Sequence, residues 1–101
     1  SQIGDHQDAI EDYSKVLEIY PNNSKVYFQR AINKKKLDDF QGAIDDYTKT
    51  TEINPNDFNA YFNRGNIKEA LGDLKGACED WKKAAGLGDE DAAKLVEENC
   101  G

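Results

Sequence analysis

The chain has 101 residues, of which 38% are hydrophobic and 33% are charged, a composition typical of one small globular domain. Its net charge of −7 at pH 7 argues against nucleic-acid binding, because affinity for phosphate backbones comes largely from cationic side chains. No apolar run approaches the roughly 18 to 20 residues of a membrane-spanning helix, so we expect no membrane insertion.

The start of the sequence indicates a piece of a longer protein. The chain contains no Met, begins part-way into a repeat, and lacks the basic start and apolar middle of a secretory signal in residues 1–20. We therefore expect the natural start to lie elsewhere. The sequence does not fix the compartment, and the cytoplasm is the default expectation.

Similar amphipathic segments recur at a spacing of 34 residues. QDAIEDYSKVLEIYPNN (7–23), QGAIDDYTKTTEINPND (41–57) and KGACEDWKKAAGLGDED (75–91) place apolar residues at helical spacing. Two further related segments, SKVYFQRAINKKKLDD (24–39) and FNAYFNRGNIKEALGD (58–73), lie between them. The predicted helices span about 5–20, 24–37, 40–54, 58–71, 74–86 and 89–99.

Helix-breaking and capping residues agree with these boundaries. Pro21 and Pro55 follow the second helix of each pair, because proline lacks the N–H that a continuing helix needs. The residues that we expect to cap helices or relax turns are Asn22 to Ser24, Asn56, Asp57, Asp39, Asp73, Gly4 and Gly72. The short loops predict antiparallel neighbouring helices.

The last predicted helix differs from the others and carries one of the two cysteines. Within DEDAAKLVEENC, small and apolar residues lie beside an acidic face, which predicts a cap over the preceding pair. Two cysteines without a CxxC motif argue against structural zinc. We expect Cys78 and Cys100 to be reduced thiols; the alternative is a disulfide, if the last two helices run antiparallel.

The repeating unit resembles the tetratricopeptide repeat, a 34-residue helix–turn–helix with fixed aromatic, small and proline positions. The residues that carry the resemblance are Tyr27, Ala31, Ala43, Tyr47 and Pro55, then Tyr61, Gly65, Ala77 and Trp81, with Ala9, Tyr13 and Pro21 from an incomplete first unit. Small residues are needed where two helices cross closely, and the aromatic ring fills the remaining space.

This resemblance implies an all-α fold, a right-handed superhelical α-solenoid of antiparallel helix pairs. It divides one domain into residues 1–23 (second helix of an incomplete repeat), the complete repeats 24–57 and 58–88, and a capping helix 89–101. The segment WKKAAGLGDEDAAKL is similar to the related Sel1-like repeat, with Asp89 where a proline is expected.

Two positions depart from the family pattern in both complete repeats. Arg30 and Arg64 replace the usual leucine, and Lys34 and Lys68 replace the usual aromatic residue. We expect an ion-pair ladder between repeats, with contact to a ligand as the alternative. The expected partners one helix earlier are Asp12 for Arg30 and Asp46 for Arg64, or the adjacent Glu11 and Asp45.

Catalytic chemistry has no basis in the sequence. The one histidine, His6, is expected to be exposed at a helix start, and adjacent acidic residues such as Asp45 and Asp46 diverge on a helix rather than converge. The glycines form no nucleotide-binding motif. We therefore predict a non-enzymatic protein without cofactor or metal.

The resemblance implies that the first helix of each repeat lines a concave groove that binds a peptide or partner helix. The implied groove residues are Lys25, Phe28, Gln29, Ile32, Lys35, Lys36, Asn59, Phe62, Asn63, Asn66 and Glu69. Residues 24–37 hold five cations and no acid, whereas residues 38–54 hold five acids and one lysine, so an acidic ligand is favoured.

Three alternatives stay open at this point. Phe28 and Phe62, expected to be exposed, can instead pack against neighbouring helices. The Lys and Asn set with which some family members hold a C-terminal carboxylate is matched only at Asn66, which argues against that mode of chaperone-tail binding. The chain can also be an architectural segment of a longer solenoid, or form a homodimer through helix 5–20, whose Ala9, Ile10, Tyr13 and Leu17 face lacks a first-helix partner.

Overall fold

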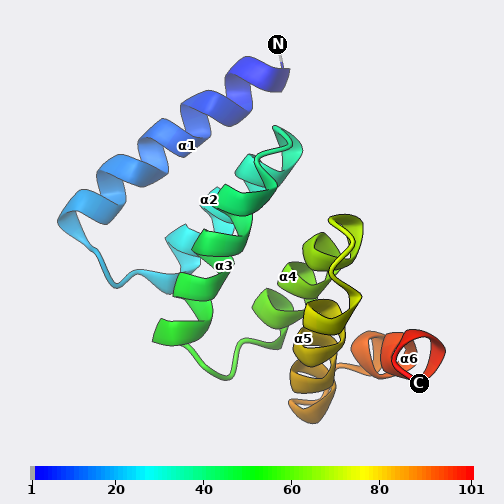
Figure 1. The fold of residues 1–101 in the computed structure, drawn as a ribbon. Coiled ribbons are helices and arrows are strands. Elements are labelled where there is room, and N and C mark those ends of the chain that lie inside the picture. Colours follow the sequence, from blue (N-terminus) through cyan, green and yellow to red (C-terminus); the bar gives the residue numbers. More distant parts are fainter. Residues whose placement is uncertain (1) are drawn as a thin grey trace. The chain divides into compact units, whose positions relative to one another are not determined.

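The structure, a computed structural model, describes residues 2–101, and that part of the chain contains helices and no strand. The helices are α1 (Gln2–Ile19), α2 (Ser24–Lys36), α3 (Phe40–Ile53), α4 (Phe58–Ala70), α5 (Leu74–Gly86) and α6 (Glu90–Asn99) (Figure 1). Every predicted helix is present, and the largest difference is that α1 begins at Gln2. None of the helices in residues 2–101 is long and apolar enough to cross a membrane.

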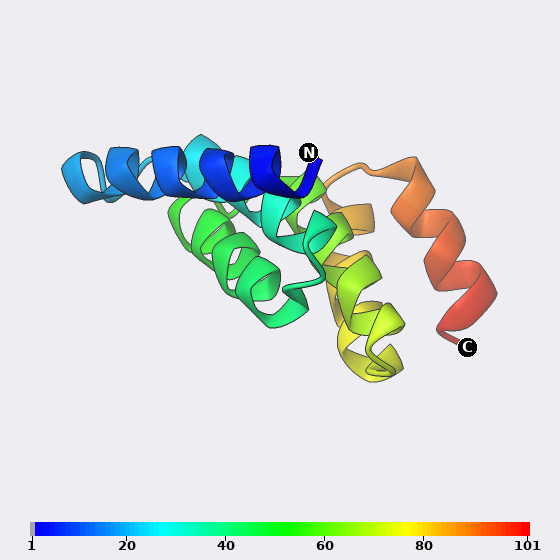
Figure 2. The ribbon, with the colours of Figure 1, turned by 90° about the horizontal axis from the view of Figure 1, so that it is seen from above.

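The helices form two compact units, which are described separately. Unit 1 is Ser1–Pro55 with α1 to α3, and unit 2 is Asn56–Gly101 with α4 to α6. In unit 1, α2 packs against both α1 and α3; in unit 2, α5 packs against both α4 and α6. Within the pairs α2–α3 and α4–α5 the helices run in opposite directions, as the short loops require (Figures 1 and 2).

Side-chain caps begin five of the helices. The carboxylate of Asp39 accepts a hydrogen bond from the backbone N–H of Gly42, and Asp73 does the same for Gly76. The capping residues of α2 to α6 are Asn23, Asp39, Asp57, Asp73 and Asp89. The caps expected near residues 22–24 and 56–57 and at Asp39 and Asp73 are confirmed, whereas Gly4 lies inside α1 rather than in a turn.

The turns inside the two pairs need a left-handed residue at the same place. Asp38 has a φ of 61° and Gly72 has a φ of 87°. Glycine adopts this conformation without the Cβ clash that other residues suffer, and aspartate is among the few side chains that tolerate it. The turn function expected of Gly72 is therefore confirmed, and Asp38 performs it in unit 1.

Each unit buries a seam between a small and an aromatic residue. Ala31, Ala43 and Tyr47 are at most 1% exposed in unit 1. Ala77 and Trp81 are fully buried in unit 2, and Gly65 lies against the indole ring of Trp81. The predicted pairing of small and aromatic residues is confirmed in unit 2, because the bare helix surface at Gly65 admits the ring of Trp81, and the predicted burial of Ala31, Ala43 and Tyr47 is confirmed in unit 1.

The last helix covers α5, as predicted for a cap. Ala92 joins a buried cluster with Ala77, Trp81 and Ala84. The expectation of two reduced thiols is wrong: Cys78 of α5 and Cys100 after α6 form a disulfide, with their Cα atoms 5.7 Å apart. The reason is the return of α6 along α5, which brings the end of one helix beside the middle of the other.

Candidate functional site

The residues of α2 that were predicted to line a groove divide into an exposed and a half-buried group. The exposed residues are Lys25, Gln29, Lys35 and Lys36. Phe28 and Ile32 are half-buried. Because the exposed group carries three ammonium groups and an amide, this side of α2 offers hydrogen-bond donors and positive charge.

Phe28 packs within unit 1 rather than standing exposed. Its ring meets the ring of Tyr47 edge to face, with 5.4 Å between centroids and 74° between planes. This geometry suits the ring quadrupoles and stabilises the α2–α3 seam. The expected exposure of Phe28 is therefore wrong, and the alternative of packing against a neighbouring helix is correct.

The α4 residues of the predicted set show the same division. Asn59 and Glu69 are exposed, whereas Asn63 is half-buried. Phe62 is also half-buried and packs against the cluster around Trp81, so its expected exposure is wrong as well. The exposed part of α4 also includes Phe58, which is 37% exposed, and Glu69 is its charged residue, in contrast to the three lysines of α2.

Asn66 has a structural contact that the sequence did not predict. The indole N–H of Trp81 donates to the side-chain oxygen of Asn66 at 3.1 Å. A buried indole N–H needs an acceptor, and Asn66 supplies it while its amide N–H₂ group remains a donor. The signal in the sequence was the change from Tyr47 to Trp81 together with the change from Ile32 to Asn66.

A buried carboxylate holds two cations in unit 1. Arg30 donates to both oxygens of Asp46, from Nε at 2.8 Å and from Nη2 at 2.7 Å, and Lys34 Nζ lies 3.1 Å from Oδ2. Asp46 is only 3% exposed. Unit 2 repeats this arrangement with Arg64, Lys68 and Asp80. We call these two groups the carboxylate clamps of unit 1 and unit 2.

The clamp of unit 2 has nearly the same geometry. Arg64 donates to Asp80 from Nε at 2.8 Å and from Nη2 at 2.6 Å, and Lys68 Nζ lies 3.3 Å away. Each arginine and its aspartate are 16 residues apart. Because the two helices of a pair are antiparallel and joined by a short turn, residues at this separation lie at the same level.

The predicted partners of the arginines are therefore wrong. The aspartate that binds each arginine comes from the next helix of the same pair, not from the helix before it. Asp12 and Glu11 are exposed on α1, and Asp45 accepts a hydrogen bond from Gln41. The ion pairs lie within repeats instead of linking them; the signal was the acidic residue on the buried side of α3 and α5.

Further contacts hold the guanidinium groups in place. Arg30 donates from Nη1 to the hydroxyl of Ser14 on α1 at 3.0 Å. The guanidinium carbon Cζ of Arg30 also lies 5.6 Å from the ring centroid of Tyr27, at cation–π distance. The hydrogen bond to Asp46 raises the pKa of Arg30, although desolvation opposes it. Arg64 has a raised pKa because of Asp80. Both guanidiniums therefore stay protonated well above neutral pH.

The clamps leave three cations of α2 for other partners. Among the ion pairs found in residues 2–101, none involves Lys25, Lys35 or Lys36. These ammonium groups are exposed, whereas Lys34 and Arg30 are engaged by Asp46. The positive charge that α2 presents to solvent thus comes from three lysines rather than from all five cations.

His6 is not the exposed helix-start residue that was expected. Its ring Nδ1 lies 2.8 Å from the side-chain oxygen of Asn33, so it joins α1 to α2 in unit 1, and it is half-buried. Within residues 2–101, no group of three His, Cys, Asp or Glu side chains is placed to hold a metal ion.

Comparison with known proteins identifies the family of this chain. The family model described as tetratricopeptide repeat matches residues 1–23 and 58–91, together more than half of the chain. A second model, described as TPR repeat, matches residues 34–72. No curated protein matches the chain.

Several solved structures are similar to the chain. The first TPR of Spaghetti (RPAP3), bound to the HSP90 peptide SRMEEVD, is 25% identical with a TM-score of 0.85, over 96% of this chain and 79% of that one. The Arabidopsis OM64 TPR domain is 29% identical with a TM-score of 0.84, over 94% and 79%. The MamA RS-1 ArsTM double mutant is 17% identical with a TM-score of 0.79, over 82% and 47%, and shares the fold.

Proposed function

The chain belongs to the tetratricopeptide repeat family, and from this premise we propose that it is a non-catalytic protein-interaction module that binds an extended segment of a partner protein. Two similar structures are TPR domains, and one of them holds a peptide. That similarity supports peptide binding as the activity of this chain.

We place the binding groove on the first helices α2 and α4, with the exposed and half-buried residues of both as its lining. The proposed lining is Lys25, Phe28, Gln29, Ile32, Lys35, Lys36, Asn59, Phe62, Asn63, Asn66 and Glu69. For this purpose residues 1–23, 24–57, 58–88 and 89–101 act as one domain, a proposal supported by a TM-score of 0.85 over 96% of the chain.

The ligand that this groove fits best is acidic. The observation that carries this proposal is the set of exposed lysines on α2, Lys25, Lys35 and Lys36, none of which is paired within residues 2–101. Opposite charge accelerates encounter and fixes orientation. The peptide held by the Spaghetti domain, SRMEEVD, contains three acids and one arginine, in keeping with this charge.

The proposed binding mode differs from that of family members that hold a ligand's C-terminal carboxylate with a set of lysine and asparagine residues. Phe28 and Ile32 occupy two of the positions concerned and are half-buried in unit 1. Asn66 offers its amide N–H₂ group to a ligand, while its oxygen accepts from Trp81. We propose that Asn59, Asn63 and Asn66 supply hydrogen bonds to a ligand backbone and that the lysines of α2 supply positive charge for its acids.

An amide-shift titration with the peptide SRMEEVD tests this proposal. We expect the triple variant Lys25→Ala, Lys35→Ala and Lys36→Ala to lose about tenfold in affinity, because each exposed charge contributes up to about 1 kcal/mol. The matched control removes three other exposed lysines: Lys15→Ala, Lys75→Ala and Lys94→Ala. Equal affinities of the two variants would reject the basic groove.

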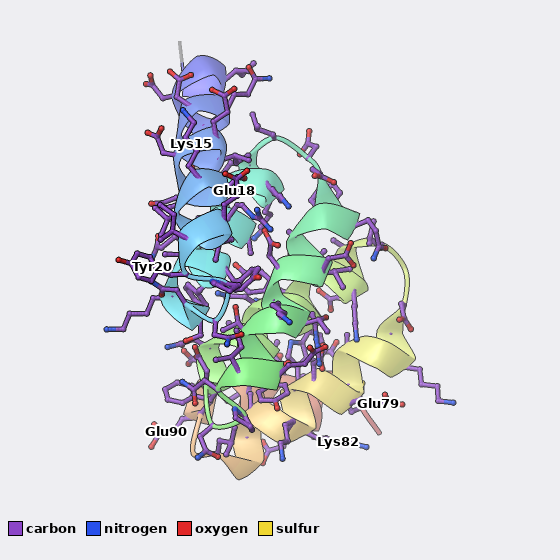
Figure 3. All side chains as sticks on the ribbon, turned by 90° about the vertical axis from the view of Figure 1, so that its left-hand side faces the viewer. Lys15, Glu18, Tyr20, Glu79, Lys82 and Glu90 are labelled. Atoms are coloured by element: carbon purple, nitrogen blue, oxygen red, sulfur yellow. A yellow bond between two sulfur atoms is a disulfide. The ribbon has the colours of Figure 1, made fainter. Side chains whose placement is uncertain are left out.

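The architectural function, including a homodimer through helix 5–20, is supported by the surface of α1. Ile19 is 71% exposed, and Ile3 and Tyr20 are each 63% exposed. Figure 3 shows Tyr20 projecting from the end of α1. Sedimentation distinguishes the two functions: a dimer that Ile19→Lys dissociates supports the architectural one, whereas a monomer that binds SRMEEVD supports the groove.

A further inference from the structure

The disulfide of unit 2 borders an open hollow of about 420 Å³. Both Cys78 and Cys100 line this hollow, together with Lys75, Glu79 and Lys82 of α5. Figure 3 shows Glu79 and Lys82 on the same exposed stretch of that helix. The volume is large enough for a small thiol or the thiol-bearing tip of a larger reductant to reach the sulfur atoms.

The charged groups of the hollow lie near both sulfurs. Lys75 and Lys82 stand three residues before and four residues after Cys78, so all three side chains share one face of α5, and Cys100 lines the same hollow. Nearby ammonium groups stabilise a thiolate, so the two lysines favour the departure of a cysteine sulfur when the disulfide is attacked. Glu79 and the carbonyl oxygen of Asn99, which lies 4.0 Å from Sγ of Cys78, act in the opposite sense.

We propose that Cys78–Cys100 is a redox modification site whose substrate is a dithiol reductant. One thiolate of the dithiol attacks one sulfur of the disulfide, the S–S bond breaks, and the other cysteine leaves as a thiolate that takes a proton from solvent. The second thiol of the reductant then displaces the attacked cysteine from the mixed disulfide. Two electrons and two protons pass to the chain, and the reductant becomes a disulfide. This site is independent of the peptide-binding groove.

The consequence of reduction falls on α6. This helix packs against α5 through Ala92, Leu95 and Val96, a small apolar contact that the disulfide supplements. The cross-link joins residues that are 22 apart in the sequence. Its loss raises the conformational entropy of the segment between Cys78 and Cys100 when α6 is detached from α5. We expect local opening of α6 to become about a hundredfold more frequent on reduction.

Reduction of the whole chain with dithiothreitol tests the proposal. Thiol titration should give two thiols after reduction and none before it, and amides of α6 should exchange about a hundredfold faster while those of unit 1 are unchanged. Trp81, the sole tryptophan, lies in the cluster that α6 covers, so its emission should shift to the red. Equal exchange of α6 in both redox forms would overturn the proposed consequence.

The lysines of the hollow have their own readout. Lys75→Ala with Lys82→Ala should slow reduction several-fold, because the departing thiolate loses two nearby ammonium groups. Lys94→Ala, which removes an exposed lysine outside the hollow, is the matched control and should reduce at the wild-type rate. An unchanged rate of reduction in the lysine variant would overturn the proposed effect of the hollow on the disulfide.

Discussion

The helix pairs α2–α3 and α4–α5 have the same backbone plan but close their seams with different residues. Unit 2 sets Gly65 against Trp81, and unit 1 has the buried residues Ala31 and Tyr47 at the corresponding repeat positions. The larger ring stands opposite the smaller residue. We infer that the combined volume of the small and the aromatic residue stays nearly constant, because a larger ring fits the seam only where the facing residue is smaller.

The pairs also differ in where they place a polar side chain beside the core. In α2, Ile32 precedes Asn33, which contacts the ring of His6. In α4 the order is reversed: Asn66 accepts from the indole of Trp81, and Ile67 is 1% exposed. Each asparagine lies where a polar ring atom of a neighbouring helix meets it, as expected if a half-buried amide needs a partner.

The clamps do not differ between the units, whereas the outer surfaces do. Both pairs join an arginine and a lysine to one buried aspartate, at nearly equal distances. Outside the clamp, α2 presents Lys25, Lys35 and Lys36, while α4 presents Phe58, Asn59 and Glu69. We infer that the clamp serves the helix pair and that the variable outer residues serve recognition.

The largest effect should come from removing the centre of a clamp. Asp46→Ala and Asp80→Ala should each lower the free energy of unfolding by about 3–5 kcal/mol, because two cations lose their partner in a half-buried place. Urea denaturation measures the change. The matched control is Asp12→Ala at the same repeat position of α1, where the carboxylate is exposed and the change should stay within about 0.5 kcal/mol.

Replacing all three residues of the unit 2 clamp tests whether the clamp stabilises the helix pair better than apolar residues would. Arg64→Leu, Lys68→Tyr and Asp80→Leu together restore an apolar seam, and apolar replacement of a buried ion pair is often neutral or stabilising. We expect this triple variant to be more stable than Asp80→Ala alone. A triple variant as unstable as the single one would show that the clamp has a function beyond joining α4 to α5.

The second largest effect should come from exchanging the small residue of one unit for that of the other. A Cβ at Gly65 would lie 2.9 Å from two indole atoms of Trp81 and 3.2 Å from the carbonyl oxygen of Ala77. Gly65→Ala should therefore lower the free energy of unfolding by about 2 kcal/mol, despite the better helix propensity of alanine. Thermal unfolding measures this change.

A double-mutant cycle sharpens that result. Trp81→Tyr recreates the Tyr47 ring of unit 1 in unit 2, so Gly65→Ala should cost less in its presence than in the wild type. The coupling should be about 1 kcal/mol and favourable. Additive effects would contradict the idea that the two residues share one volume.

Prediction from sequence succeeded where a single helix or a single turn decides the outcome. The periodic segments gave the helices, and Asp39 and Asp73 gave caps, because these features depend on residues a few positions apart. The seams at Ala31 and Gly65 followed from spacing together with the family resemblance.

Prediction failed where the choice lay between two neighbouring helices. The i and i+4 spacing of Arg30 and Lys34 shows that they share a face, but not which adjacent helix supplies the acid. The disulfide of Cys78 with Cys100 depends on how α6 returns along α5, which no local pattern specifies. The groove remains a proposal for the same reason, since side-chain exposure on α2 depends on packing such as that of Phe28 against Tyr47.

A smaller effect is expected from the asparagine that holds the indole. Asn66→Ile copies Ile32 of unit 1 and leaves the buried N–H of Trp81 without its acceptor, so stability should fall by about 1 kcal/mol. Trp81→Phe removes the donor, and in that background Asn66→Ile should change stability less. If Asn66→Ile costs the same with and without the indole N–H, the hydrogen bond contributes nothing.

The smallest effect should appear at the left-handed turn residue. Asp38→Gly places in unit 1 the residue that unit 2 has at Gly72, and removing Cβ at a φ of 61° should stabilise the chain by about 0.5 kcal/mol. The reverse exchange, Gly72→Asp, should destabilise it by a similar amount. Paired thermal melts check both signs. The turn lies outside both seams. Stabilisation by Asp38→Gly together with destabilisation by Gly72→Asp would show that the units differ there in backbone cost alone. Destabilisation by both exchanges would mean that the Asp38 carboxylate stabilises the turn of unit 1.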